Sequence, residues 1–345
     1  MNPRIYNLRN LLLRNKLDAM LLSKPANIAY LSGLESSDAY LLISADKKII
    51  VTDFRYQELV RTDFSDWGNK IAHGSKPEAI ISLIKKYKFR RVGFEAHSLF
   101  FSQYEQLLKG VSHKLIPTAG IIERLRAIKD SDEIVNIRRA TEITKRAIND
   151  TFKRIKYGVT EFEIAAYLDG RLRLYGAQRN GFETIVAFGK RTSLPHAKPS
   201  LKRLLRGEHA LIDAGGAFRG YNSDLTRPVF LSRISKKIRD IAKIVADASQ
   251  RAIEKAKPGI PALRVDKEAR DYIKRYGYSE NFAHALGHGI GREVHELPSI
   301  NKKSGDILQP GMVFTIEPGI YIPDVGGVRV EDIILITEKG HEVVS

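Results

Sequence analysis

The chain has 345 residues, enough for two domains, and its 43% apolar and 28% charged content is typical of a globular protein. It contains no cysteine, which excludes disulfides, cysteine-ligated zinc and a thiol nucleophile and suits a reducing cytoplasm. No stretch approaches the roughly 20 apolar residues of a membrane span, and the apolar run Leu11–Leu13 is too short for a signal peptide. We therefore expect a cytoplasmic protein without a membrane partner.

The net charge of +17 raises the question of nucleic-acid binding. The excess of lysine and arginine is spread along the chain, and its densest clusters, residues 85–91 and 202–206, are short. A solvated basic surface explains such a distribution better than a nucleic-acid site does.

Residues 1–118 are expected to form a small α/β domain. Its strand-like and helical patterns lie at Ala19–Leu22, Tyr40–Ile43, Lys48–Thr52, Glu78–Tyr87 (the helix) and Arg91–Phe94. The second and third of these are joined by a short polar turn, which predicts a hairpin. A new helical system begins after Thr118, so residues 119–345 are expected to form the second domain.

Four helices are predicted in the second domain, and two of them begin with a capping box, in which a polar residue and a glutamate three positions later cap the first turn. The capping boxes are Asp130 with Glu133 and Thr160 with Glu163. The third and fourth helices are residues 236–257 and 259–276, and strand-like segments follow each pair of helices.

An internal repeat relates the two halves of this domain. Shifted by 101 residues, Gly158-Val159-Thr160 falls on Gly259-Ile260-Pro261, and Tyr175-Gly176 falls on Tyr276-Gly277. Chance similarity between two amphipathic helices explains matching apolar positions, but hardly matching glycines at the helix ends. We therefore interpret the domain as two related halves, each built from two helices and the strands that follow them.

The repeat extends to four carboxylates. The strand-like run ending near Asp213 resembles the run ending at Glu317, and Asp224 has its counterpart in Glu331. An acid beside an apolar strand is costly to bury unpaired, and two such pairs brought together would repel each other unless cations lay between them. The pattern therefore predicts two divalent ions. Taken singly, each acid could instead cap a turn, pair with a nearby arginine or face solvent.

Three histidines lie in the stretch FAHALGHGIGREVHE, residues 282–296. The spacing of His284 and His288 would suit a zinc site on a helix, but Ala285 replaces the glutamate of such a motif and alternating glycines disfavour a helix. An extended segment running close to a ligand fits better, and His295 follows in the same segment. A buried strand with incidental histidines is the alternative. A nucleotide-binding loop is disfavoured because no βαβ unit frames the glycines.

Taken together, these stretches resemble the pita-bread metallopeptidases, and within them the Xaa-Pro peptidases (aminopeptidase P and prolidase). The motifs that carry the resemblance are FETIV (182–186), LPHA (194–197), YNSDLTR (221–227), HALGHGIG (284–291), VHE (294–296), TIEPG (315–319) and GVRVED (327–332). Residues 1–118, with TDFRY at 52–56, resemble that family's N-terminal domain more weakly. The resemblance implies an α+β protein, with a small creatinase-like α/β domain before a pita-bread domain of two pseudo-symmetric halves.

The resemblance also implies roles for individual residues. The implied metal ligands are Asp213, Asp224, His288, Glu317 and Glu331, with Asp224 and Glu331 bridging the two ions. The implied catalytic residues are Glu317 as proton carrier, His196, His284 and His295 on the substrate side, and Arg329, which would brace a bridging carboxylate or meet a substrate carboxylate. Two positions depart from the expected pattern: Phe188 stands where a serine is common, and Arg292 where an aliphatic residue is usual.

The implied reaction is hydrolysis of the peptide bond before proline by two divalent ions, which lower the pKa of a shared water toward about 7. The oxygen-rich ligand set favours Mn²⁺, with Co²⁺, Fe²⁺ or Zn²⁺ as alternatives. The substrate would be a proline-containing peptide, and the resemblance implies a homodimer.

Several alternatives stay open at this point. The motifs do not separate aminopeptidase P from prolidase, and an aminopeptidase of other specificity is a further possibility. A methionine aminopeptidase is disfavoured by the N-terminal domain, and a creatinase by the metal ligands. Outside the enzymes, the chain could be a non-catalytic binding module on the same fold, or a degenerate peptidase of low activity.

Overall fold

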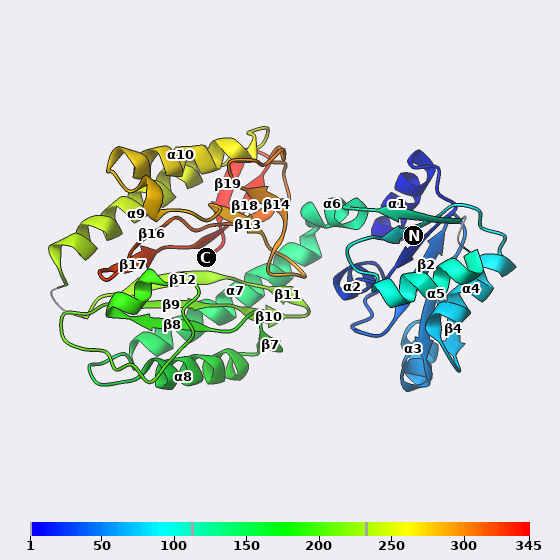
Figure 1. Ribbon diagram of the computed structural model, residues 1–345, viewed down its shortest axis with the longest axis horizontal. Coiled ribbons are helices and arrows are strands. Elements are labelled where there is room, and N and C mark those ends of the chain that lie inside the picture. The colour runs from blue at the N-terminus through cyan, green and yellow to red at the C-terminus, as the bar shows by residue number, and fades with distance from the viewer. Residues whose placement is uncertain (1, 112–113, 232–233) are drawn as a thin grey trace. The chain divides into compact units, whose positions relative to one another are not determined.

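The computed structural model describes residues 2–111, 114–231 and 234–345 (Figure 1). The chain divides into two compact units, Met1–Arg126 and Ala127–Ser345. The sequence pattern places this boundary at Thr118, eight residues earlier. The segment between the two positions holds helix α6, whose Ile122 packs into the core of the first unit. None of the helices in the described part of the chain is both long and apolar enough to cross a bilayer.

The first unit is built on a six-stranded mixed sheet in the order β4-β3-β2-β1-β5-β6. The strands are β1 (Ala19–Leu22), β2 (Tyr40–Ser44), β3 (Lys48–Asp53), β4 (Gly68–Ala72), β5 (Val92–Glu95) and β6 (Leu115–Thr118). The helices are α1 (Pro3–Arg14), α2 (Pro25–Ser32), α3 (Gln57–Asp63), α4 (Lys76–Lys86), α5 (Phe101–Val111) and α6 (Ile121–Ala127), with the short turn η1 (Phe54–Tyr56). Strands β2 and β3 pair antiparallel, which confirms the predicted hairpin.

Both faces of this sheet are buried. Successive residues of a strand point to opposite faces, and here alternate residues enter two different cores. In β1, Met20 and Leu22 join the core that contains residues of α1 and α2. Ala19 and Leu21 join the opposite core, with residues of α4 and α5. A fully apolar strand in the sequence thus corresponds to a strand covered by helices on both sides.

The second unit contains two helix pairs and the strands that pack on them. The first half comprises α7 (Ser131–Phe152), α8 (Glu161–Leu174), β7 (Arg179–Asn180), β8 (Ile185–Phe188), η3 (Gly189–Ser193), β9 (Ala210–Ala214), β10 (Gly216–Phe218), β11 (Tyr221–Asn222) and β12 (Leu225–Val229). The second half comprises α9 (Lys236–Lys255), α10 (Ala262–Arg275), η4 (Ser279–Asn281), β13 (Gly287–Gly289), β14 (Glu296–Ile300), β15 (Val313–Ile316), β16 (Gly319–Ile322), β17 (Gly326–Arg329), β18 (Asp332–Thr337) and β19 (Gly340–Val343).

Within this unit the strands lie between the two helix pairs, with α7 and α8 on one side and α9 and α10 on the other (Figure 1). The sheets run β11-β10-β7, β12-β9-β8, β14-β13-β15-β18-β19 and β16-β17. One core joins α7 and α8 to the strands of the first half, and another joins α9 and α10 to those of the second. Both predicted capping boxes form, at Asp130 and at Thr160.

The repeat seen in the sequence corresponds to a repeat in hydrogen bonding. The amide of Gly158 donates to Leu204 O at 2.9 Å, and the amide of Gly259 donates to Leu308 O at 2.8 Å. Both glycines have positive φ, 91° and 81°, a conformation that other residues rarely adopt. The two halves therefore use the same hydrogen-bonded turn before their second helix, which explains why the glycines match.

Candidate metal centre

The four predicted acids converge where the strands of the two halves meet. Asp213 lies on β9, and the other three stand in the short connections next to strands: Asp224 before β12, Glu317 after β15 and Glu331 before β18. Several hydrogen bonds join the two halves here, two of them between Glu331 and Thr226. The Glu331 amide donates to Thr226 O at 3.2 Å, and Thr226 Oγ1 donates to Glu331 Oε2 at 2.7 Å. The pseudo-symmetry thus places both acid pairs in one region.

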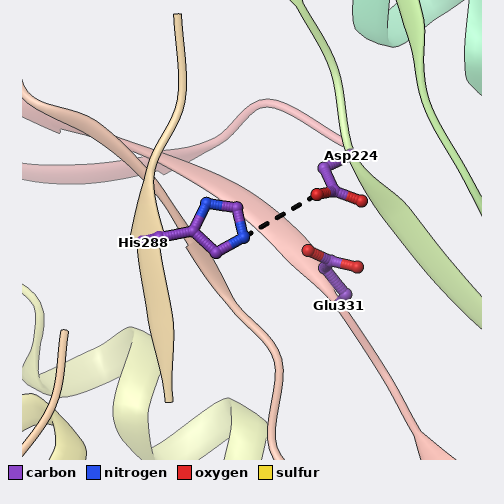
Figure 2. A group of neighbouring side chains, drawn as sticks. All are labelled: Asp224, His288 and Glu331. Carbon is purple, nitrogen blue, oxygen red and sulfur yellow. Dashed lines mark ion pairs between the residues drawn. The ribbon is translucent and has the colours of Figure 1, made fainter. Parts of the chain in front are cut away.

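His288, on β13, points into this group. Its Nε2 lies 3.3 Å from Glu317 Oε1 and 3.7 Å from Asp224 Oδ2. Asp224, His288 and Glu331 each offer one ligand atom, and these atoms lie within 4.8 Å of one another (Figure 2). The other ring nitrogen, Nδ1, lies 3.2 Å from Gly289 O and must donate to it. Once Nε2 has lost its proton, as metal binding requires, its lone pair would be directed at the acids, the arrangement of a metal-binding histidine.

Unsatisfied oxygens provide a test of whether a cation fits. Asp213 Oδ1, Asp224 Oδ1 and Glu331 Oε1 are buried and have no hydrogen-bond partner among the residues that the structure describes. A buried carboxylate oxygen without a partner is costly, and most buried polar atoms in native proteins have one. Two of these oxygens belong to acids grouped with His288, and cations would supply partners for all three. The residues present therefore fit a divalent metal centre.

The pKa values of the acids lead to the same conclusion. Burial, followed by the charges of neighbouring carboxylates, raises the pKa of Asp224 and of Glu331 well above the ordinary range. Burial also raises the pKa of Asp213, although Arg329 opposes the shift. For Glu317, burial would raise the pKa, but the hydrogen bond and charge of His288 outweigh it and the pKa is lowered. Without cations, this site cannot hold all four carboxylates ionised at low cost.

Arg329 contacts a proposed metal ligand. Its side chain is 4% exposed, and Nη2 lies 2.5 Å from Asp213 Oδ2. It also donates to Thr226 Oγ1 at 3.0 Å and to the Tyr321 hydroxyl at 2.7 Å. The arginine thus braces Asp213, rather than either of the two acids expected to bridge the ions.

The three other predicted histidines differ in their surroundings. His284 is flanked by the rings of Phe282 and Tyr321, with centroids 5.0 Å and 5.6 Å away, and burial lowers its pKa. The ring centroid of His295 is 4.1 Å from that of His288, and its pKa is lowered by burial and then by the charges of His288 and His196. His196 itself is exposed, in the loop after η3. His295 is exposed as well, whereas His284 is half-buried. Because their pKa values are lowered, the rings of His284 and His295 are neutral at pH 7.

Three supporting residues were not singled out from the sequence. They are Thr226, Thr315 and Tyr321. Thr315 Oγ1 donates to Glu317 Oε1 at 3.2 Å and accepts from the His288 amide at 3.1 Å. Both threonines, like Arg329, stand two positions from a predicted ligand. Because side chains two residues apart on a strand share a face, the period of two could have indicated them. Tyr321 has no comparable local signal.

The two departures from the family pattern have different structural settings. Phe188 is completely buried in the core of the first half, and it therefore belongs to the packing of β8 rather than to a pocket surface. The guanidinium of Arg292 lies 4.7 Å from the ring centroid of Tyr221 and stacks there as a cation–π pair.

Comparisons with known proteins place this geometry in a family. Residues 135–338 match the metallopeptidase family M24, and residues 4–128 match the creatinase/prolidase N-terminal domain. The chain belongs to metallopeptidase family M24. The match confirms the expected creatinase-like N-terminal domain followed in the sequence by a pita-bread domain. It also makes the chain a metallopeptidase, for which divalent metal ions are implied.

Several M24 relatives resemble the chain over nearly its full length. An Xaa-Pro dipeptidase of Pyrococcus furiosus is 36% identical, with 99% of this chain and 97% of the relative covered. The structure of an Xaa-Pro dipeptidase from Bacillus anthracis superposes with a TM-score of 0.96 at 35% identity, covering 99% of this chain and 96% of that one. An X-Pro aminopeptidase from Thermotoga maritima gives a TM-score of 0.88 at 34% identity, covering 95% of both chains.

Proposed function

We propose that this M24 metallopeptidase hydrolyses the peptide bond before proline in Xaa-Pro peptides. The buried, unpaired oxygens of Asp213, Asp224 and Glu331 support the metal centre, and the similarity to Xaa-Pro dipeptidases supports the substrate. The proposed ligands of two divalent ions are Asp213, Asp224, His288, Glu317 and Glu331. Bound there, such ions would supply Lewis-acid activation of water and of the substrate carbonyl. The oxygen-rich set supports Mn²⁺ as the ion.

Glu317 is the proposed proton carrier to the leaving proline nitrogen. In the metal-free protein the protonated imidazole of His288 lowers the pKa of Glu317 in spite of burial, and bound cations would favour the same ionised form, which can accept a proton. Thr315 Oγ1 orients the same carboxylate. The side chain therefore holds a fixed direction while it receives and returns the proton.

His284 is proposed to contact the substrate through Nε2. Its Nδ1 lies 2.7 Å from Ala285 O and must donate to that carbonyl, so in the neutral ring Nε2 is an acceptor. Nε2 is buried and has no partner within the described part of the chain. A substrate N–H is the group that such an atom can bind, whereas donation to a developing oxyanion would require the protonated ring. His295 and His196 are proposed to bind on the same side.

Substrate assays test the proposal. We expect an Ala-Pro dipeptide or an Ala-Pro-Ala tripeptide to be cleaved before proline on the order of 10- to 100-fold faster than the matched Ala-Ala peptide, as measured by release of free alanine in Mn²⁺. Cleavage of the dipeptide alone identifies a dipeptidase, and cleavage of the tripeptide identifies an aminopeptidase. Failure to cleave either one at saturating Mn²⁺, together with salt-sensitive RNA binding, would instead indicate a non-catalytic binding module.

The chain is also proposed to form a homodimer. Light scattering at low micromolar concentration should then give about twice the 38.9 kDa of one chain. A mass of one chain across that concentration range would contradict the dimer. The cytoplasmic location expected from the composition stays a prediction, which cell fractionation would test.

A further inference from the structure

The turn that carries His295 is folded around a buried carboxylate. This turn, residues 291–296, leads from β13 into the first residue of β14, and the Gly291 amide donates to Glu293 O at 3.1 Å. The Glu293 amide donates to Glu296 Oε2 at 3.3 Å, so the Glu296 side chain folds back under its own turn. A Cβ on Gly291 would overlap Glu296 Oε1, which explains why glycine stands there. The conformation of the turn thus depends on where this carboxylate is held.

Lys129 holds the carboxylate from a distant part of the sequence. Its Nζ lies 2.8 Å from Glu296 Oε1, and the two side chains are only 1% and 2% exposed. Lys129 stands between α6 and α7, where its amide donates to Gly311 O at 2.8 Å. Its ammonium also donates to Ala127 O at 3.4 Å. The lysine is therefore anchored at both its backbone and its charged end.

The other end of the turn is tied by Asn222. Its amide and its Nδ2 both donate to Gly291 O, at 2.8 Å and 2.9 Å. At the far end, Glu296 pairs with Gly289 in the β13–β14 ladder, one residue after His288. His295 lies between the Asn222–Gly291 hydrogen bonds and the Glu296–Gly289 pairing, so these contacts fix its distance from His288. Moving Glu296 would move the histidine that precedes it.

We propose that Lys129 is a positioning residue for His295, acting through Glu296. Stability alone does not explain the pair, because replacing a buried ion pair by apolar residues is often neutral or stabilising. What the pair adds is a single location for the carboxylate and hence for the turn. The catalytic consequence rests on the proposed function, in which His295 lines the substrate side. The structural consequence does not.

The test is Lys129→Met, which keeps the length of the side chain and removes its charge. Hydrogen exchange of amides 291–296 should accelerate roughly tenfold or more, in the full chain with and without Mn²⁺. Hydrolysis of the Xaa-Pro substrate should fall on the order of 10- to 100-fold in kcat. The same substitution should cost little further in a His295→Ala background, because the two changes remove one effect. Lys129→Arg, which restores the charge, should recover most of the activity.

A matched control is Lys202→Met. Lys202 pairs with both oxygens of Glu208, at 2.8 Å and 2.9 Å, in another part of the same unit. It should leave exchange at residues 291–296 unchanged. If Lys129→Met fails to fold, Glu296→Gln removes the opposite charge and should accelerate the same amides.

Unchanged exchange in the turn for a folded Lys129 or Glu296 variant would overturn the inference. An equal loss of kcat with and without His295 would also overturn it, because it would show a general structural effect. If the wild-type chain cleaves no Xaa-Pro peptide, the proposed function fails, while exchange still decides whether Lys129 holds the turn.

Discussion

Replacing Glu331 by glutamine is expected to raise the melting temperature of the metal-free protein while removing its stabilisation by Mn²⁺. The folded-state pKa of Glu331 is raised by burial and then by neighbouring carboxylates. A carboxyl group with a raised folded pKa contributes stability that is present below the unfolded pKa of about 4.3 and is lost as pH rises through the folded pKa. Glutamine remains neutral and keeps an oxygen for the Thr226 hydroxyl, which now donates to Glu331 Oε2.

Metal reverses the sign of this effect. For the wild-type protein, Mn²⁺ at about 100 times its Kd should add about 2.7 kcal/mol to the free energy of unfolding, because it binds only the folded state. For Glu331→Gln that gain should largely disappear, because one proposed bridging ligand is gone. Thermal melts with chelator or with Mn²⁺, at pH 5 and pH 8, measure both effects. The melting temperature of the metal-free wild type should fall from pH 5 to pH 8, and that of the variant should fall less, because Asp224 keeps a pKa raised by burial.

The exposed Glu280 supplies a control for the loss of one negative charge. Glu280→Gln should change neither the pH dependence nor the response to metal. If Glu331→Gln melts lower than wild type in chelator and still responds fully to Mn²⁺, the four acids do not form the proposed centre. Repeating the melts with Co²⁺, Fe²⁺ and Zn²⁺ would rank the ions.

Replacing Glu317 by glutamine is expected to lower kcat for an Xaa-Pro peptide by a factor on the order of 10² to 10⁴, the contribution of a well-placed general acid–base group. Glutamine nearly preserves the shape of the side chain and can accept the hydrogen bond from Thr315 Oγ1. It cannot accept the proton. The measurement is steady-state hydrolysis at saturating Mn²⁺, with isothermal titration calorimetry to quantify the bound metal.

Calorimetry separates the two roles proposed for Glu317. If kcat falls while two ions still bind, the loss belongs to proton transfer. If metal binding falls in parallel, the loss belongs to the metal site. His284→Ala provides a contrast, since it should lower activity and leave metal binding intact. The exposed Glu338, changed to glutamine, is the control. Full activity in purified Glu317→Gln or His284→Ala would reject the assigned role.

The parts of the structure that could be predicted from the sequence rest on local or repeated signals. A capping box lies within four residues, so Asp130 and Thr160 identify two helix starts on their own. The repeat identifies the acids because Asp213 and Glu317 occupy equivalent positions in two segments of similar sequence. The glycines around His288 exclude a helix for the same reason of local geometry.

The parts that could not be predicted depend on contacts between distant residues. The sequence allows Arg329 two roles, and only its 2.5 Å contact with Asp213 decides where the guanidinium lies. Lys129 and Glu296 are far apart in the chain, and no local sequence pattern at either residue predicts their ion pair. The boundary between the two units lies after the predicted Thr118 for a related reason. Contacts of Ile122 with the core of the first unit, which the local sequence does not show, decide that the segment after Thr118 belongs to that unit.

The division of the proposed ligands between the two halves has a consequence for biosynthesis. The first half carries Asp213 and Asp224, and the second carries His288, Glu317 and Glu331. A nascent polypeptide that has left the ribosome only as far as β12 offers two of the proposed ligands, both aspartates, and would bind ions weakly and with little selectivity. Loading must therefore wait until the remaining strands are translated and docked, so that the identity of the captured ion is chosen by a finished coordination shell.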